Sequence, residues 1–246
     1  KHQLKKFIEA YNIPSVCSPA ASDIYGTSNE LSIGTVGSIG GSRAGNFAVQ
    51  NSDYVLVIGS KMCSQLTGVK DNFARDAKVT AVDIDEFEHT KAGVVDQVIL
   101  CDAKEFLIRL SECEINRHDI KWSDKCIHWK QLFDLKNEQF ICELKDTDRI
   151  DLYCFLDELN DVLPENATII TDAGFEELTV PSAISYKDGQ RCLFPAAQGA
   201  MGYAIPAVIG AYEAGRENIC CIVGDGSIMM NIQELQIIAS KKIPVK

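Results

Sequence analysis

The chain reads CCIVGDGS over residues 220–227 and continues as NIQEL over residues 231–235. An apolar run that ends in a Gly-Asp-Gly-Ser turn is typical of a parallel strand passing into a helix. Glycines let backbone N–H groups approach a phosphate closely, and a helix N-terminus adds the positive end of its dipole. A carboxylate in such a turn can bind Mg²⁺ together with phosphate oxygens. The turn therefore fits a phosphate site with Asp225 as metal ligand, and equally an ordinary turn with Asp225 as helix N-cap.

Strand and helix patterns alternate over most of the chain. Apolar runs predict strands at residues 13–17, 54–58, 78–82, 98–100, 168–171 and 219–223. Helical spacing predicts helices at residues 4–11, 44–50, 103–110, 152–163, 200–214 and 231–240. This order predicts an α/β fold with two doubly wound parallel sheets.

A change of pattern separates the two predicted α/β units. From residue 111 to about residue 149 the chain carries charged residues at helical spacing and no strand pattern, which indicates a helical linker. We therefore place a first, Rossmann-like domain at residues 1–148, with its linker from about residue 111, and a second domain at residues 149–246.

Composition excludes several classes of protein. Of the 246 residues, 24 are Lys or Arg and 35 are Asp or Glu, a net charge of −11. This acidic balance argues against sequence-independent binding of nucleic acid or of an anionic membrane. No apolar run approaches the ~20 residues of a membrane helix, and the N-terminus lacks the apolar core of a signal peptide. The 10 cysteines form no CxxC pair, which favours reduced thiols and a cytoplasmic protein.

The stretch before the turn indicates a family. Residues 198–211 read QGAMGYAIPAVIGA, and together with the turn they resemble the diphosphate-binding domain of thiamine diphosphate enzymes. The glycine-rich residues 34–45, the stretch GNFAVQNSDYVLVIG at residues 45–59 and VDID at residues 82–85 look like that family's central domain. Within the family, the chain is most similar to the acetolactate synthase large subunit. The resemblance follows the family's order over nearly the whole chain, with the second domain as the first part of the C-terminal cofactor-binding domain.

The resemblance implies cofactor-binding roles at three places in the second domain. Asp225 would bind Mg²⁺, and the N–H groups of Gly226 and Ser227 would bind the diphosphate. Met201 would be the apolar residue over which the cofactor bends, although core filling is the alternative for an isolated methionine. The implied cofactor-binding residues are Gly174, Gly199, Ala200, Met201, Gly224, Asp225, Gly226 and Ser227.

No catalytic residue is assigned within the chain. The family's activating Glu belongs to an N-terminal domain of the partner subunit, and that domain would precede Lys1. The resemblance also implies a second Mg²⁺ ligand, an Asn beyond the strand that follows Pro244. We therefore expect a segment truncated at both ends, inactive by itself, whose complete site forms in a homodimer or homotetramer.

The implied function is a thiamine diphosphate- and Mg²⁺-dependent carboligation of a 2-oxo acid, pyruvate, with loss of CO₂. Alternatives are a 2-oxo acid decarboxylase, a relative that transfers an acetyl unit to a nucleotide sugar, and a non-catalytic nucleotide-binding module. Phe175-Glu176-Glu177 stands where acetolactate synthases usually carry a Gln-His-Gln-like segment. An acidic pair there would repel a diphosphate if it pointed inward, which keeps a different substrate or a different diphosphate contact open.

A bound FAD is a further question for the first domain. The glycines of residues 34–45 follow G-x-x-G-x-x-G-G, which is not the dinucleotide fingerprint G-x-G-x-x-G. The resemblance nevertheless implies that Asp83 and Asp85 contact a ribose, and a solvated pair at a strand end fits them equally. Lys61 stands where an Arg usually helps to hold FAD, and Lys lacks the planar bidentate geometry of Arg. FAD is therefore an alternative that we do not favour.

Overall fold

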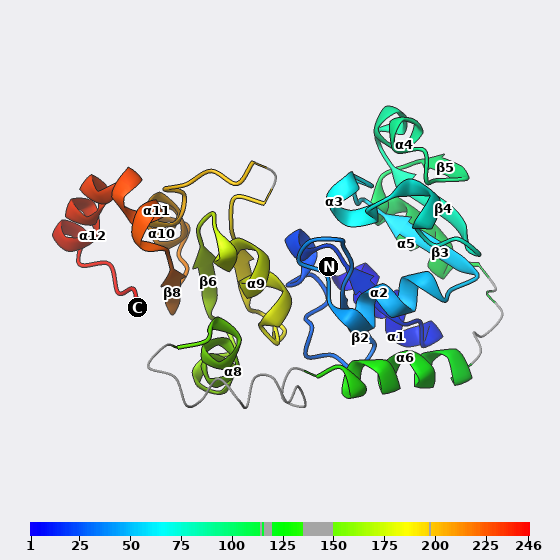
Figure 1. Cartoon of the computed structure of the whole chain (residues 1–246), viewed down its shortest axis with the longest axis horizontal. Helices are drawn as coiled ribbons and strands as arrows, with labels where there is room; N and C mark the ends of the chain where they lie inside the picture. The colour runs from blue at the N-terminus through cyan, green and yellow to red at the C-terminus, as the bar shows by residue number, and fades with distance from the viewer. Residues whose placement is uncertain (114, 116–119, 135–149, 197) are drawn as a thin grey trace. The chain divides into compact units, whose positions relative to one another are not determined.

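The computed structural model describes residues 1–113, 115, 120–134, 150–196 and 198–246 (Figure 1). The chain divides into two compact units: Lys1–Ser18 with Asn29–Asp134, and Pro19–Ser28 with Leu135–Lys246. Every strand pair formed by the described residues is parallel. The predicted α/β class with parallel sheets is thus confirmed. No helix in the described ranges is long and apolar enough to cross a bilayer.

The first unit contains a two-stranded sheet, β1-β2, and a three-stranded sheet, β3-β4-β5. Its elements are α1 (His2–Tyr11), β1 (Ser15–Cys17), β2 (Ser32–Thr35), α2 (Arg43–Gln50), β3 (Tyr54–Ile58), α3 (Ser64–Thr67), η2 (Lys70–Asn72), β4 (Lys78–Asp83), α4 (Glu86–Ala92), β5 (Gln97–Leu100), α5 (Ala103–Ser111) and α6 (Ile120–Leu132). The three strands predicted from continuous apolar runs are β3, β4 and β5. Helix α6 packs against α2 and β2 (Figure 1). The remainder of the predicted linker, residues 135–149, lies outside the described residues.

The glycine-rich loop expected at residues 34–45 begins later in the structure, because Gly34 and Thr35 belong to strand β2. The side chain of Asn46 closes this loop, because its Oδ1 accepts from Gly37 N–H at 3.0 Å and its Nδ2 donates to Gly37 O at 2.9 Å. The hydroxyl of Ser42 caps α2 by accepting from Gly45 N–H at 3.1 Å. These N–H groups therefore serve the loop itself.

The second unit is built on a three-stranded sheet in the order β7-β6-β8. Its elements are η1 (Pro19–Ala21), α8 (Leu152–Val162), β6 (Thr168–Thr171), α9 (Phe175–Ala183), β7 (Arg191–Leu193), α10 (Ala204–Glu213), β8 (Ile219–Ile222), α11 (Asp225–Met230), η5 (Ile232–Glu234) and α12 (Leu235–Lys241). Val245 adds a parallel bridge to Ile219 at the outer side of β8. Strand β6 is thus central, with neighbours on both sides.

The alternation of side chains along β6 divides the core of this unit in two. Ile169 packs in a cluster with residues of α8 and α9, whereas Ile170 packs with residues of α10 and β8. Both isoleucines are fully buried. Because successive strand residues face opposite sides, helices on both faces bury the whole strand. The carboxyl end of β6 is therefore held rigidly.

Residues 19–28 pack against the second unit although they precede most of the first in sequence. Thr27 Oγ1 donates to Ile184 O and accepts from Tyr186 N–H, each at 2.8 Å. The buried carboxylate of Asp23 accepts from Cys192 N–H at 3.1 Å. No local pattern in the sequence indicates this packing.

Two predicted helices near the turn have different bounds. The helix predicted at residues 200–214 begins at Ala204, because Gly202, with φ +85°, belongs to a turn. The helix predicted at residues 231–240 is α12, and it follows α11 and η5. Helix α11 begins directly at Asp225, inside the predicted turn.

Two glycines inside helices allow a matched test of close packing. A Cβ on Gly45 in α2 would lie 2.2 Å from Thr35 O, whereas a Cβ on Gly210 in α10 would meet nothing within 4 Å. Both alanine substitutions gain helix propensity, about 1 kcal/mol at most. We expect Gly210→Ala to raise the free energy of unfolding and Gly45→Ala to lower it, both measured by urea denaturation. Equal effects of the two substitutions would contradict this packing.

Candidate functional site

Three segments meet at the carboxyl ends of β6 and β8. They are residues 172–177 after β6, residues 198–203 before α10, and residues 224–227 after β8. The chain leaves β6 through α9 toward β7, whereas it leaves β8 through α12 toward Val245 on the opposite side of the sheet. This divergence makes the point between β6 and β8 a topological switch point, where open α/β sheets bind their ligands.

The buried carboxylate of Asp172 joins the first two segments. Its Oδ1 accepts from Ala173 N–H at 2.8 Å and from Gly202 N–H at 2.9 Å, and its Oδ2 accepts from Ala204 N–H at 2.6 Å. The side chain is fully buried. Hydrogen bonds to an ionised acceptor are about twice as strong as neutral ones. Asp172 therefore fixes residues 198–203 against the sheet, a positioning role that the sequence analysis did not assign.

Residues 224–227 are tied to the same place. Ser227 is buried, and its hydroxyl donates to Ala173 O at 3.1 Å. Asn231, just beyond α11, donates through Nδ2 to Gly202 O at 2.8 Å. The third segment is thus bound to both of the others, and the set of residues predicted from the sequence is brought together around one point.

Met201 lies over the turn. Its side chain is 50% exposed, and its Cε would lie 3.6 Å from a Cβ on Gly226. Gly199 and Ala200 are exposed beside it, so their backbone is accessible. An isolated methionine is more often core filling, but this one is half-exposed above the turn.

The N–H groups of the turn already bind anions of the protein itself. Gly226 N–H donates to Oδ1 of Asp225 at 2.8 Å, and Gly224 N–H donates to Oε1 of Glu176 at 3.0 Å. Asp225 is exposed and so retains lone pairs for a further ligand. The donor set of the turn therefore suits an anion, here supplied by two carboxylates.

The acidic pair at the start of α9 points toward the site. Glu176 reaches Gly224, and Glu177 Oε2 would lie 3.4 Å from a Cβ on Gly199. Burial, followed by repulsion from Asp172 and Glu176, raises the pKa of Glu177. The sequence analysis noted that this pair would repel a diphosphate if it pointed inward. Glu176 does point inward. Gly174, the residue before α9, would carry a Cβ only 2.7 Å from Glu176 Oε2.

Asp225 does not belong to a larger cluster of potential metal ligands in the part of the chain that the structure describes. Within the described ranges, no three His, Cys, Asp or Glu side chains are grouped to hold a metal ion. None of the described cysteines forms a disulfide. Mg²⁺ in phosphate sites is usually bound by one or two protein carboxylates together with phosphate oxygens. Asp225 can therefore serve as the protein ligand of Mg²⁺ in this turn.

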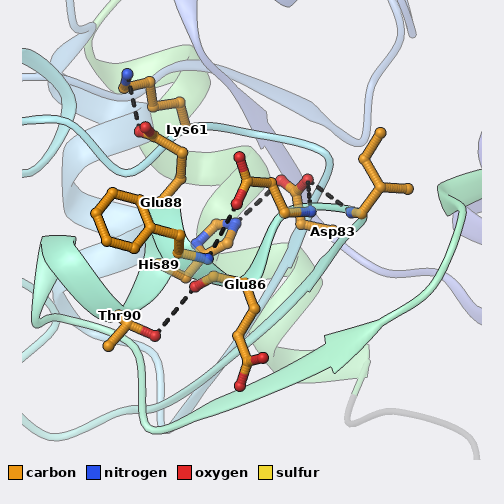
Figure 2. Close-up of polar contacts among 9 residues, drawn as sticks. Lys61, Asp83, Glu86, Glu88, His89 and Thr90 are labelled. Atoms are coloured by element: carbon orange, nitrogen blue, oxygen red, sulfur yellow. Dashed lines mark hydrogen bonds and ion pairs between the residues drawn. The ribbon is translucent and has the colours of Figure 1, made fainter.

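In the first unit, the residues proposed for FAD are engaged with their own neighbours. Figure 2 shows Lys61 bound to Glu88, with 2.8 Å between Nζ and Oε2, and His89 directed at Asp83. Asp83 Oδ1 also accepts from the N–H groups of Ile84 and Asp85, at 2.7 and 3.2 Å. These contacts explain the positions of Lys61 and Asp83 without a nucleotide.

The same cluster contains a buried histidine. His89 is 1% exposed, its Nε2 lies 3.0 Å from Asp83 Oδ2, and its Nδ1 has no hydrogen-bond partner among the residues the structure describes. Asp85 caps α4 by accepting from Phe87 N–H at 3.0 Å. Burial opposes ionisation of Asp83, but the hydrogen bonds from His89 and from the two backbone N–H groups outweigh it and lower the pKa of this carboxyl.

The chain combines two parallel α/β units. The second unit carries an anion-binding Gly-Asp-Gly-Ser turn at its switch point, which is typical of a cofactor-binding protein. Residues 1–110 match the family "Thiamine pyrophosphate enzyme, central domain", and residues 172–246 match "Thiamine pyrophosphate enzyme, C-terminal TPP binding domain". The chain belongs to the thiamine pyrophosphate enzymes, of which it carries these two domains.

Three proteins similar to this chain are each named acetolactate synthase. Over 244 residues the chain is 28% identical to "Acetolactate synthase isozyme 2 large subunit" of Escherichia coli K12, a match covering 99% of this chain and 43% of that protein. It is 32% identical over 251 residues to "Acetolactate synthase, chloroplastic" of Arabidopsis thaliana, covering 99% and 36%. The large subunit of Lactococcus lactis is 30% identical over 244 residues, covering 98% and 41%. The chain thus spans about two fifths of the length of these relatives.

The residues at the switch point fit the diphosphate of thiamine pyrophosphate. The turn presents N–H donors that bind carboxylates in this structure, and Asp225 beside them is exposed. Gly226 leaves a space that a Cβ would fill, 3.6 Å from the Met201 methyl group. The Glu176 carboxylate, which accepts from Gly224 N–H, opposes a second anion at this turn.

The buried role of Asp172 leads to a stability prediction. Asp172→Ala leaves three N–H groups without their acceptor, and we expect a loss of about 3 kcal/mol or more in the free energy of unfolding. Asp151→Ala is the matched control, because Asp151 accepts from Tyr153 and Cys154 N–H as the N-cap of α8. The loss there is expected to be about 1 kcal/mol. Urea unfolding that ranks the two variants in the reverse order would refute the role of Asp172.

The lowered pKa of Asp83 leads to a pH prediction. A carboxyl whose pKa is lower in the folded state stabilises the fold above its unfolded pKa of about 3.9. That contribution disappears as pH falls through the lower, folded pKa. We expect Asp83→Asn to be less stable than the wild type at pH 7 and the difference to shrink below about pH 4. Thermal melts across pH measure it, with the exposed Asp53→Asn as control. A difference independent of pH would exclude this electrostatic origin.

Proposed function

We propose that this chain is the cofactor-binding part of a thiamine diphosphate- and Mg²⁺-dependent enzyme of the acetolactate synthase type. The reaction is decarboxylation of a 2-oxo acid, pyruvate, and addition of the remaining two-carbon unit to the carbonyl group of a second 2-oxo acid. The names of the relatives support the reaction type, and the two matched domains support the cofactor. FAD is not part of the proposal.

The observation that carries the proposal is the convergence of the three segments at the switch point. Asp172 accepts from Gly202 N–H and Asn231 donates to Gly202 O, and these two bonds position the loop before α10 against the turn after β8. When bound, thiamine diphosphate supplies the carbanion chemistry that the protein lacks. The protein's task is to bind this group, to orient it and to exclude water.

Each predicted residue has a distinct task in this arrangement. The exposed carboxylate of Asp225 binds Mg²⁺, and the N–H groups of Gly226 and Ser227 donate to the diphosphate. Gly224, which begins the turn, contributes a further N–H. The half-exposed side chain of Met201 would be the apolar surface over which the cofactor bends.

The remaining predicted residues act through their backbone. Gly199 and Ala200 are exposed next to Met201, so their peptide groups are available to the aminopyrimidine ring. Gly174 lets the chain turn sharply from β6 into α9 with φ +134°, a conformation that favours glycine. This turn places the start of α9 at the rim of the site.

An assembly of two or four identical subunits is part of the proposal. Large apolar side chains are exposed around the site: Phe175, Leu178, Met201, Met229, Met230 and Ile232. Contiguous exposed apolar surface marks contact sites on soluble proteins. A second subunit that covers this rim would exclude water from the cofactor and complete the site.

One observation favours a second candidate, a binding module of the same family without catalysis. The Glu176 carboxylate on Gly224 N–H occupies a donor that a diphosphate would use. A purely structural turn would satisfy its donors in this way. Binding of the cofactor separates the two candidates, and an acetolactate product assay then separates carboligation from simple decarboxylation.

The role of Asp225 can be tested by calorimetry on the full-length gene product. Titration of thiamine diphosphate in the presence of Mg²⁺ is expected to give micromolar binding for the wild type. Asp225→Ala, which removes the metal ligand, should weaken it at least 100-fold, equivalent to about 2.8 kcal/mol. The exposed Asp161→Ala removes the same charge outside the site and should bind as the wild type does. If all three proteins bind equally weakly, the turn is structural and the binding-module candidate, without this cofactor, replaces the enzyme.

A further inference from the structure

Glu176 makes a long-range contact inside the candidate site. It belongs to the first turn of α9, yet its Oε1 accepts from Gly224 N–H at 3.0 Å, across 48 positions of sequence. The carboxylate also folds back over Gly174, where a Cβ would lie 2.7 Å from Oε2. Glycine at both positions leaves the space in which this carboxylate lies. A carboxylate in the first turn of a helix is favourable by itself, but that alone does not require a contact with the turn after β8.

This contact places a negative charge where a diphosphate would bind. Gly224 is the residue before α11, and its N–H is directed at the carboxylate of Glu176 rather than at solvent. A diphosphate held by Gly226 and Ser227 would lie next to the same carboxylate. Two neighbouring like charges repel one another, and they do so more strongly where the protein excludes water.

Neighbouring groups add to this effect. Asp172 is buried behind the turn, Glu177 lies beside Gly199, and Asp225 is in the turn itself. The contact that Glu176 makes within the site is with a neutral backbone N–H, which does not cancel its negative charge. Of these four acidic residues, only Asp225 has a role in binding Mg²⁺ in the proposed function, and only Glu176 accepts from Gly224.

We propose that Glu176 is an internal anion that competes with the diphosphate for the Gly224 turn and thereby sets the cofactor affinity of this protein. The inference rests on the proposed function, because it takes the turn to be the diphosphate site. Cofactor binding then requires the Glu176 side chain to leave Gly224 N–H, a rotation of its own torsions that needs no movement of β6 or β8. The charge of Glu176 opposes the diphosphate and so lowers the affinity for the cofactor, also when Mg²⁺ is bound.

The experiment compares affinities for thiamine diphosphate with saturating Mg²⁺ in the full-length gene product by calorimetry. Glu176→Gln keeps an oxygen that can accept from Gly224 N–H but removes the charge. Glu176→Ala removes both. Glu165→Gln is the matched control, because Glu165 is exposed in the turn before β6, at the opposite end of that strand. Thermal melts without cofactor verify that every variant is folded.

We expect both Glu176 variants to bind the cofactor about tenfold more tightly than the wild type, which corresponds to 1.4 kcal/mol. Glu165→Gln should match the wild type. Cofactor binding by both Glu176 variants and not by the wild type would also support the inference, since the charge would then close the site completely. If the wild type binds and the Glu176 variants bind equally or more weakly, the inference is wrong while the proposed function stands. If neither the wild type nor any variant binds, the proposed function itself fails.

Discussion

The candidate site depends on the buried carboxylate of Asp172. Three backbone N–H groups donate to it, one from Ala173 at the end of β6 and two from the chain that leads into α10. A buried carboxylate is costly unless such donors surround it, and the donors are equally costly without the carboxylate. The half-exposed Met201 is therefore held in place by an interaction beneath it. The fully buried strand β6 in turn fixes Asp172, because helices cover both of its faces.

Around Asp172, backbone N–H groups donate hydrogen bonds to acidic side chains. Asp172 uses N–H groups that position a loop, whereas Asp225 and Glu176 accept from the N–H groups of the turn. Backbone amides can bind an anion without adding a cationic side chain to an acidic protein. In the proposed function, a diphosphate at this turn would meet several carboxylates, and a bound Mg²⁺ would offset part of that negative charge.

The sequence predicted those parts of the fold and site that depend on local patterns. Continuous apolar runs identified β3, β4 and β6. Strand β7 was missed because three residues are too short for a periodic signal. The roles of Asp172 and Glu176 could not be read from sequence, since their partners lie 30 to 32 and 48 positions away. A polar residue after a strand looks the same whether it faces solvent or anchors a loop.

The central claim is that the turn after β8 holds the diphosphate together with Mg²⁺. A crystal structure of the full-length gene product with thiamine diphosphate and Mg²⁺ tests it most directly. The account predicts Mg²⁺ about 2.1 Å from a carboxylate oxygen of Asp225. It also predicts diphosphate oxygens on the N–H groups of Gly226 and Ser227, with Glu176 withdrawn from Gly224. A cofactor bound elsewhere, or a turn that keeps Glu176 on Gly224 N–H with the diphosphate present, would contradict it.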